Sequence, residues 1–477
     1  MGKSFRSEHD FLGQVKVPSD AYYGAFTARA NANFQISGEK AKPVFICALA
    51  KIKISACEAN RQIGILDARK AKAIEKACRE VIGGKFSSQF ILDVFQAGAG
   101  TPFNMNMNEV IANRANEILH LPKGDYARGV NPNNDVNMCQ SSNDVIPTAT
   151  RIAVLWELED LHESVGKLEK AFRMKAKRYS HVIKPGRTHL QDAVPITYGQ
   201  VFTAYADALH RDRMEINFAE HGLLEIPLGG TAIGTGIASH PQFKKKVVAE
   251  LAKSTGLPLK QGNSIELTQN FNPFVQVSGS LRSLALSLIR ISRNLQMLSS
   301  GPRTGLGEIL LPEVEPGSSI MPGKVNPSIL ECVEMVGYDV MGAEATIAMA
   351  SQAGYLELNS NGPLIAHKLL VALQLIYNAL NMLEEKCISG LRVDEKRCKQ
   401  LVDESAIFAT ALNPKLGYHT MSKVVRKALR ENKTIARVVE EEGLLSKAEL
   451  KQSFKPENLT RPSGQGLAKA RLKKRKS

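Results

Sequence analysis

The sequence predicts an all-α protein organised around a bundle of long helices. Apolar residues recur at steps of three and four over stretches longer than the roughly three turns of an average helix. These stretches run from Leu158 to Phe172, from Leu281 to Leu298 and from Leu369 to Leu383. Alternating patterns typical of strands are scarce. Long helices with one leucine-rich stripe bury that stripe by packing together at shallow crossing angles, which is the architecture of a helix bundle.

Clusters of proline and glycine interrupt these helical patterns and divide the chain. Such clusters end helices, because proline lacks a backbone N–H and glycine is conformationally free. We expect three domains: a mostly helical N-terminal domain over residues 1–140, a central long-helix bundle over 141–393, and a small helical C-terminal domain over 394–477. The clusters fall at residues 123–124, 131–132, 184–186, 227–230, 301–302 and 317–327.

The composition excludes several classes of protein. A chain of 477 residues with 43% hydrophobic content can bury a large core. No continuous apolar run reaches the ~18 to 20 residues of a membrane span, and the N-terminal residues MGKSFRSEHDF contain no apolar signal segment. The seven cysteines are scattered without C-x-x-C spacing, which favours reduced thiols over disulfides or a zinc site. We therefore expect a soluble, cytoplasmic protein.

The net charge of +15 raises nucleic-acid binding as an alternative function. Its distribution weakens this interpretation, because six positive charges lie in the last nine residues, which read as a solubilising basic tail: Lys469, Arg471, Lys473, Lys474, Arg475 and Lys476. The remaining positive field would also attract small anionic substrates. Deletion of residues 469–477 separates the two functions, since a binder would lose affinity for polyanions and an enzyme would keep its activity.

Four segments carry more neutral hydrogen-bonding groups than a helix surface requires. They are GAGTPFNMNMNEV (98–110), NNDVNMCQSSNDVIPTA (133–149), GRTHLQDAVP (186–195) and GSSIMPGKVNP (317–327). Each alone has an ordinary explanation as turn, cap or solvated side chains. The candidate side chains within them together offer many donors and almost no carboxylate, which suits a substrate with two carboxylates. The candidate residues are Thr101, Ser141, Ser142, Asn143, Thr188, His189, Ser318, Ser319, Lys324 and Asn326.

Other chemistries fit these segments poorly. The sequence has no H-E-x-x-H, no Asp-rich loop and no Cys/His cluster, so we expect no metal centre. It lacks G-x-x-x-x-G-K-[ST] and a Rossmann pattern for phosphate binding, and it lacks a G-x-S-x-G elbow. We expect no organic cofactor.

The glycines and prolines of the segment 317–327 allow successive backbone N–H groups to converge into an oxyanion nest on a loop that can close. Such a nest can stabilise an enediolate formed when a proton leaves the carbon beside a carboxylate. It can also make a serine basic, because hydrogen bonds and positive charge favour the alkoxide. Ser318 is the candidate base, and Lys324 is the candidate carboxylate ligand.

The segment GSSIMPGKVNP is the signature loop of the fumarase/aspartase superfamily, and the other three segments resemble the remaining active-site segments of that family in the same order. The resemblance also covers EHDFLGQVKVPSDAYYG (8–24), LGGTAIGTG (228–236), LSSGPRTGL (298–306) and FKPENL (454–459). It implies a three-domain helical subunit, a tetramer with a twenty-helix core, and active sites built by three chains.

The resemblance is closest to the aspartase and fumarase branch. K-G-D-Y at 123–126 and I-E-L-T-Q-N at 265–270 are similar to aspartases, whereas Q-S-S-N-D at 140–144 is the fumarase form. Pro102-Phe103 and N-S-N-G-P at 359–363 are typical of neither. The aspartase reading implies reversible elimination of ammonia from L-aspartate to give fumarate, and the alternative is elimination of water from L-malate.

The resemblance also implies roles for the candidate residues. Ser318 would remove the Cβ proton. Thr101, Ser141, Ser142 and Ser319 would hold the β-carboxylate. Lys324 and Asn326 would hold the α-carboxylate, while Asn143, Thr188 and His189 would contact the amino group.

Overall fold

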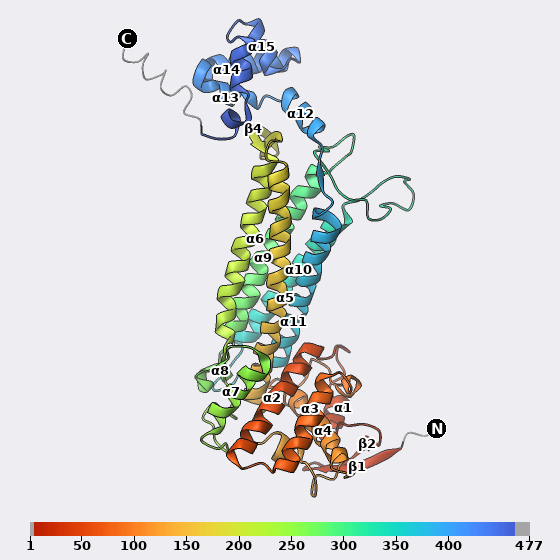
Figure 1. Ribbon diagram of the computed structural model, residues 1–477. Coiled ribbons are helices and arrows are strands. Elements are labelled where there is room, and N and C mark those ends of the chain that lie inside the picture. The colour runs from red at the N-terminus through yellow and green to blue at the C-terminus, as the bar shows by residue number, and fades with distance from the viewer. Residues whose placement is uncertain (1–3, 463–477) are drawn as a thin grey trace. The chain divides into compact units, whose positions relative to one another are not determined.

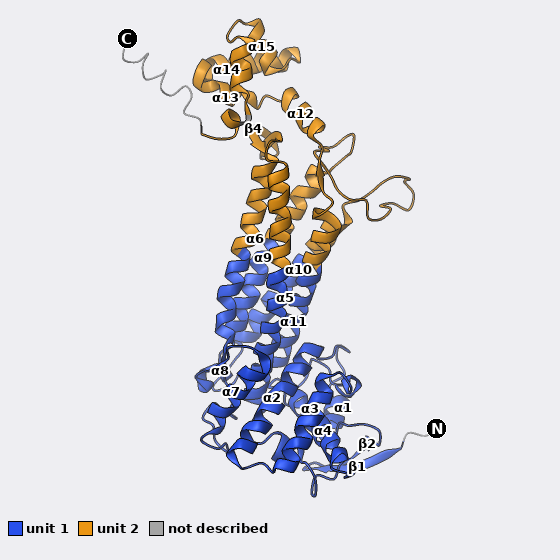
Figure 2. Ribbon diagram, in the orientation of Figure 1, with its two compact units in different colours: residues 1–163, 212–286, 336–378 blue, residues 164–211, 287–335, 379–477 orange. Residues whose placement is uncertain are grey.

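The computed structural model describes residues 4–462 and is predominantly helical, which confirms the predicted fold class (Figure 1). The basic tail predicted at 469–477 lies outside the described residues. The chain forms two compact units (Figure 2): unit 1 contains residues 1–163, 212–286 and 336–378, and unit 2 contains residues 164–211, 287–335 and 379–477. The division into domains at residues 140 and 393 stays a prediction.

Five long helices carry the apolar periodicity, and the boundary between the units falls inside each of them. They are α5 (Ser142–Arg178), α6 (Tyr198–Glu220), α9 (Asn272–Leu298), α10 (Ser328–Gln352) and α11 (Gly362–Leu383). The predicted stripe on α5 is completely buried: Leu158, Leu161, Val165, Leu168 and Phe172 are each 0% exposed. The helices therefore form for the reason that the sequence indicated, which is burial of one apolar stripe each.

Unit 1 also contains shorter helices and two small sheets. The hairpin of β1 (Phe5–Asp10) and β2 (Gly13–Pro18) precedes α1 (Ala25–Asn33), α2 (Pro43–Ile63), α3 (Ala68–Ile82) and α4 (Thr101–Ile118). Further along the chain, β5 (Glu225–Ile226) pairs in parallel with β6 (Lys260–Gln261), beside α7 (Phe243–Thr255) and α8 (Ser264–Gln269).

Unit 2 contains an antiparallel hairpin of β3 (Ile183–Thr188) and β4 (Gln191–Thr197), and a short antiparallel pair of β7 (Ile309–Leu310) and β8 (Arg392–Val393). Small helices complete its C-terminal part: α12 (Glu395–Glu404), α13 (Phe408–Leu416), α14 (Tyr418–Glu431), α15 (Ile435–Glu441), α16 (Lys447–Ser453) and α17 (Pro456–Leu459). They enclose their own apolar cluster around Leu412 and Val438, both 0% exposed.

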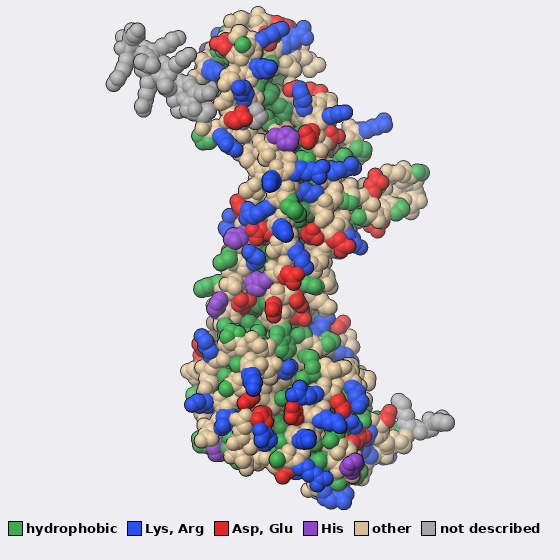
Figure 3. Space-filling view, in the orientation of Figure 1, with side chains coloured by type: hydrophobic (Ala, Val, Ile, Leu, Met, Phe, Trp, Pro, Cys, Tyr) green, Lys and Arg blue, Asp and Glu red, His purple; other side chains and the backbone are tan. Residues whose placement is uncertain are grey.

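The segment 362–388, which contains α11, is long and apolar enough to cross a membrane by composition, although the sequence has no uninterrupted apolar run of that length. More than half of its most apolar window is buried inside the protein, as expected for a core helix. On the face drawn in Figure 3, basic and acidic side chains are interspersed.

Candidate active site

A cavity of about 820 Å³ opens in unit 1 beside the first turns of α4 and α5, and polar side chains line one part of its wall. It brings together four of the predicted site residues, although Thr101 is forty residues from the others along the sequence. The polar side chains on this part of its wall are Thr101, Asn104, Asn137, Gln140, Ser141, Ser142 and Asn143.

Two glycines allow the chain to enter α4 beside this cavity. Gly100 precedes α4 with φ +71°, and a Cβ there would lie 2.9 Å from the Ile146 side chain. A Cβ on Gly98 would lie 1.7 Å from the backbone oxygen of Ser360, which no side chain can tolerate. The backbone oxygen of Gly98 also accepts a hydrogen bond from Gly362. The segment G-A-G therefore packs directly against residues 360–362, one of the places where this sequence departs from the family pattern.

The start of α5 is held by a buried carboxylate. Asp144 accepts hydrogen bonds from the backbone N–H of Ser141 at 2.9 Å, Gly229 at 3.0 Å and Thr231 at 2.9 Å. Burial raises the pKa of Asp144 to about 6, and these three backbone donors oppose that effect. Ser141 in turn caps the helix by accepting from the Asn143 N–H at 3.3 Å. The glycine-rich segment 228–236 thus fixes the position of the predicted serines.

Asn143 is also positioned by this segment. Its side-chain nitrogen donates to the backbone oxygen of Ala232 at 2.7 Å.

Sequence reasoning missed Lys53, a buried residue that contacts three of these polar side chains from behind the wall. Its side chain is 0% exposed, and its nitrogen donates to the side-chain oxygens of Asn104, Asn137 and Gln140 at 2.7, 3.1 and 2.9 Å. The available signal was its place on α2, four residues after the buried Leu49 and therefore on the apolar face. A lysine at such a position needs a buried partner.

A second wall of the cavity carries two buried carboxylates, Glu8 and Glu109. Glu109 accepts from the backbone N–H groups of Gly24, Phe26 and Thr27 at 2.8, 2.9 and 3.1 Å. Burial raises the pKa of Glu109 to about 7, although these donors act in the opposite direction. Both carboxylates flank Gly24, where a Cβ would lie 2.6 Å from Glu8 and 2.8 Å from Glu109.

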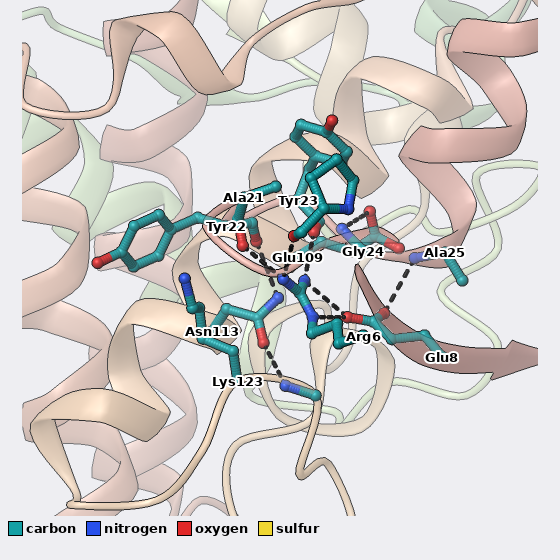
Figure 4. A network of polar contacts seen from close by, with 12 residues as sticks. Arg6, Glu8, Ala21, Tyr22, Tyr23, Gly24, Ala25, Glu109, Asn113 and Lys123 are labelled. Carbon is teal, nitrogen blue, oxygen red and sulfur yellow. Dashed lines mark hydrogen bonds and ion pairs between the residues drawn. The ribbon is translucent and has the colours of Figure 1, made fainter. Parts of the chain in front are cut away.

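Arg6 ties Glu8 to the turn that follows β2 (Figure 4). Its guanidinium donates to Glu8 at 2.8 Å and to the backbone oxygens of Ala21 and Tyr23 at 2.7 Å each. This contact fixes the N-terminal hairpin on the segment that leads into α1, so the hairpin forms part of the cavity wall.

In unit 2, the loop 317–327 between β7 and α10 folds back on itself. The Gly317 N–H donates to the Lys324 backbone oxygen at 2.7 Å, and the Asn326 side chain donates to the Gly317 oxygen at 2.7 Å. A Cβ on Gly317 would lie 2.6 Å from the backbone nitrogen of Asn326, so this closure requires glycine. Within the loop, the Ser318 hydroxyl oxygen accepts from the backbone N–H of Ile320 at 3.2 Å and of Met321 at 3.0 Å.

Thr188 and His189 stand at the exposed tip of the β3–β4 hairpin. His189 and Leu190 form its two-residue turn with φ of 55° and 62°, as in a type I′ turn. The hairpin is anchored just below the tip, where Arg187 pairs with the fully buried Glu308 at 2.6 Å. Glu308 also accepts from Tyr198 at 2.9 Å and pairs with Lys184 at 3.2 Å.

The predicted residues therefore form three groups. Thr101, Ser141, Ser142 and Asn143 share the cavity of unit 1. Ser318, Ser319, Lys324 and Asn326 share one loop of unit 2, and Thr188 with His189 shares the hairpin tip of unit 2. Among residues 4–462, no hydrogen bond joins the loop to the hairpin tip, and no group of three or more His, Cys, Asp or Glu side chains is placed to hold a metal ion.

Comparison with known proteins identifies the family. A family model described as lyase matches residues 13–342, and one described as the fumarase C C-terminus matches residues 408–461. The chain belongs to the fumarase/aspartase superfamily. This membership confirms the resemblance of the signature loop and the helical fold that it implied.

Relatives from both branches of the superfamily are similar over nearly the whole chain. An aspartate ammonia-lyase of Pseudomonas fluorescens is 46% identical and covers 96% of this chain and 97% of its own length. A class II fumarate hydratase of Chromobacterium violaceum is 42% identical and covers 96% of this chain and all of its own. A crystal structure of a fumarate lyase/delta crystallin from Brucella melitensis, bound to cobalt, is 43% identical with a TM-score of 0.93, covering 96% and 100% of the two chains.

The two departures from the superfamily pattern have different structural settings. Pro102 lies in the first turn of α4 and lines the cavity, while Phe103 is 5% exposed and packs edge-on against Phe45. Asn359 is buried and donates to the backbone oxygens of Ala350 and Ser351 at 3.1 and 2.8 Å. The first departure therefore changes the cavity itself, and the second secures the turn before α11.

Proposed function

We propose that this protein is an aspartate ammonia-lyase, which eliminates ammonia from L-aspartate to give fumarate and catalyses the reverse addition. The observation that carries this proposal is the environment of Ser318, whose hydroxyl oxygen accepts hydrogen bonds from two backbone N–H groups. Donors aimed at an oxygen stabilise it as an alkoxide, which an ordinary serine cannot sustain near neutral pH. An alkoxide at Ser318 can remove the proton from Cβ of the bound amino acid.

The remaining groups then stabilise the charge that this step creates. When the Cβ proton leaves, negative charge moves onto the β-carboxylate and forms an enediolate. The hydroxyl groups of Thr101, Ser141, Ser142 and Ser319 would donate to that carboxylate. Lys324 would pair with the α-carboxylate, whose charge does not change in the reaction.

The amino group would be held by the neutral acceptors of Asn143, Thr188 and His189. Asn326 has one amide hydrogen committed to Gly317, and its second hydrogen would donate to the α-carboxylate. Departure of ammonia from the enediolate then gives fumarate. Ammonia needs little acid assistance to leave, because the protonated amino group departs as a neutral molecule.

A fumarate hydratase is the second candidate. The 42% identity to the C. violaceum enzyme and the fumarase form Q-S-S-N-D at 140–144 favour it. The somewhat higher identity to the P. fluorescens enzyme, together with the aspartase-like segments at 123–126 and 265–270, favours the ammonia-lyase.

We further propose that the enzyme works as a soluble, cytoplasmic homotetramer in which each active site takes segments from three chains. The exposure of Ser319, Thr188 and His189 supports this assembly, because polar groups that hold a dicarboxylate need to be covered to exclude water.

The deciding experiment is an absorbance assay in the fumarate band with purified protein. L-aspartate should give fumarate, and L-malate should give less than a hundredth of that rate at equal concentration. Faster turnover of malate would replace the proposed function with the hydratase, and turnover of neither substrate would overturn both.

A further inference from the structure

We propose that Lys53 and Asn104 are positioning residues that make the Ser142 hydroxyl a hydrogen-bond donor to the substrate carboxylate. This inference rests on the proposed function, because it assigns work to a serine that would hold the β-carboxylate. It concerns two residues that lie behind or within the cavity wall and that no step of the reaction uses directly.

Lys53 is an unusual buried charge. Its ammonium group has three hydrogens, and three carboxamide oxygens accept them. Among residues 4–462, no carboxylate is in direct contact with it. The main compensation is the negative charge of Asp144, which opposes the burial that lowers the pKa of Lys53 to about 7. A buried ammonium without an ion pair is costly, so a core alone would favour an apolar side chain at this position.

The ammonium group fixes which way the Asn104 carboxamide faces. Its oxygen lies 2.7 Å from the Lys53 nitrogen. If the amide were turned over, its NH₂ group would face the N–H groups of Lys53, and two sets of donors would be opposed. The oxygen of Asn104 therefore points to Lys53, and its NH₂ group points the other way.

That NH₂ group reaches Ser142. The Asn104 nitrogen donates to the Ser142 hydroxyl oxygen at 3.2 Å and to the Asn137 side-chain oxygen at 3.1 Å. Ser142 is 8% exposed, and both Ser142 and Asn104 line the cavity. In the described part of the chain, the Asn104 amide is the one side-chain partner of this hydroxyl, and the hydroxyl accepts.

A serine has one hydrogen to donate. Because Asn104 gives a hydrogen to Ser142 rather than taking one, the Ser142 hydrogen is left for an acceptor in the cavity, and a carboxylate oxygen is the best such acceptor. With the opposite orientation, Ser142 would donate to Asn104 and present lone pairs to the anion. Through the Asn104 amide, Lys53 thus determines that the Ser142 hydroxyl donates its hydrogen into the cavity.

The test is a double-mutant cycle on kcat/KM for L-aspartate with Asn104→Asp and Ser142→Ala. A carboxylate at position 104 can pair with Lys53 but takes the Ser142 hydrogen, so we expect a loss of about 10- to 100-fold, similar to that of Ser142→Ala. In the Ser142→Ala background, Asn104→Asp should cost less than about threefold, because the serine that it controls is gone. Lys53→Met should behave in the same way as Asn104→Asp in both backgrounds.

The matched control is Asn106→Asp, two residues along the same helix. Asn106 is equally buried at 1% exposure, but its amide donates to the Gln89 backbone oxygen and does not line the cavity. The melting temperature of the Asn106→Asp variant should fall as much as that of Asn104→Asp, while its kcat/KM should stay within about threefold of the parent value. Losses of Asn104→Asp and Ser142→Ala that simply multiply would overturn the inference, as would an unchanged kcat/KM in folded Asn104→Asp.

Calorimetric binding of succinate separates this inference from the proposed function. Succinate offers the same two carboxylates but cannot react. If the parent protein turns over neither L-aspartate nor L-malate, the proposed function fails. The parent, Asn104→Asp, Ser142→Ala and the double variant are then compared by their Kd for succinate. If Asn104→Asp weakens succinate binding in the parent but not in the Ser142→Ala background, the positioning role is supported. Additive effects of the two substitutions, or no binding of succinate by the parent protein, reject it.

Discussion

The hydroxyl oxygen of Ser318 lies 3.0 Å from the backbone nitrogen of Met321, within a loop that is closed by hydrogen bonds at Gly317. The serine is therefore held by its own loop before any substrate arrives. Because the backbone donors are already aimed at its oxygen, little reorganisation is needed when a negative charge forms there.

Replacement of Ser318 by alanine should lower kcat by about 10³-fold or more, because no other group in the loop can act as the base. The neighbouring Ser319→Ala should lose only about 10- to 100-fold, as expected for one donor to the carboxylate. Steady-state rates with L-aspartate, together with sedimentation to show an unchanged assembly, provide the measurement. Near-parental turnover of Ser318→Ala would remove it as the base.

Replacement of Lys324 by alanine should raise KM for L-aspartate about 10- to 100-fold with a smaller change in kcat. The α-carboxylate that Lys324 is proposed to hold keeps its charge throughout the reaction, so the interaction contributes equally to ground state and transition state. The exposed Lys396→Ala in the same unit is the control for loss of one positive charge. An unchanged KM in Lys324→Ala, or an equal increase in the control, would contradict the carboxylate role.

Mixing two inactive variants should restore activity if active sites are shared between chains. Ser318→Ala alters the loop of unit 2, and Asn143→Ala alters the cavity of unit 1. When the two are dissociated and reassembled in equal amounts, about a quarter of the sites should receive both intact segments, because each is drawn at random from the two populations. Reassembly to the parental size without any recovery would place each site within one chain.

Glu109 should make the protein less stable as the pH rises from about 4.5 to about 8. Its pKa is raised by burial from 4.5 to about 7, so the folded state binds a proton that the unfolded state releases in this range. The stabilisation is complete below pH 4.5 and is lost as the pH passes 7, and it corresponds to about 3 kcal/mol.

Glu109→Gln cannot titrate and should flatten this dependence, although it should be less stable throughout because its NH₂ group faces backbone donors. Denaturant unfolding between pH 5 and pH 8 gives the slope of the unfolding free energy against pH for the parent and for Glu109→Gln. Glu75→Gln, which changes a partly exposed side chain, serves as the control for replacing one carboxyl group by an amide. Parallel curves for the parent and Glu109→Gln would show that this carboxyl group does not titrate in the range.

The sequence was sufficient for those parts of the fold and site that depend on local pattern. The leucine stripe of α5 predicted its burial, since period and burial have the same physical origin. The glycines of the loop 317–327 predicted backbone donors converging on a serine, and Ser318 accepts two of them. Both predictions needed only residues close together in the chain.

Other features could not be read from local pattern. The β3–β4 hairpin was not predicted from the sequence, and its turn gives no sequence signal, because His189 and Leu190 adopt positive φ without glycine or asparagine. Lys53 was overlooked because a lysine is usually solvated, and only the fold brings three distant carboxamides to it. The assembly proposed above would depend on the surfaces of the subunits, which periodicity does not describe.

The contact between Gly98 and Ser360 restricts how the substrate range of this protein can be redesigned. Because the backbone oxygen of Ser360 occupies the space that any side chain at 98 would need, that position is closed to variation unless the turn before α11 is rebuilt with it. Pro102 lines the cavity, so a change at that position alters the cavity wall directly. A library aimed at amino acids with larger side chains should therefore vary position 102 and leave the glycine untouched.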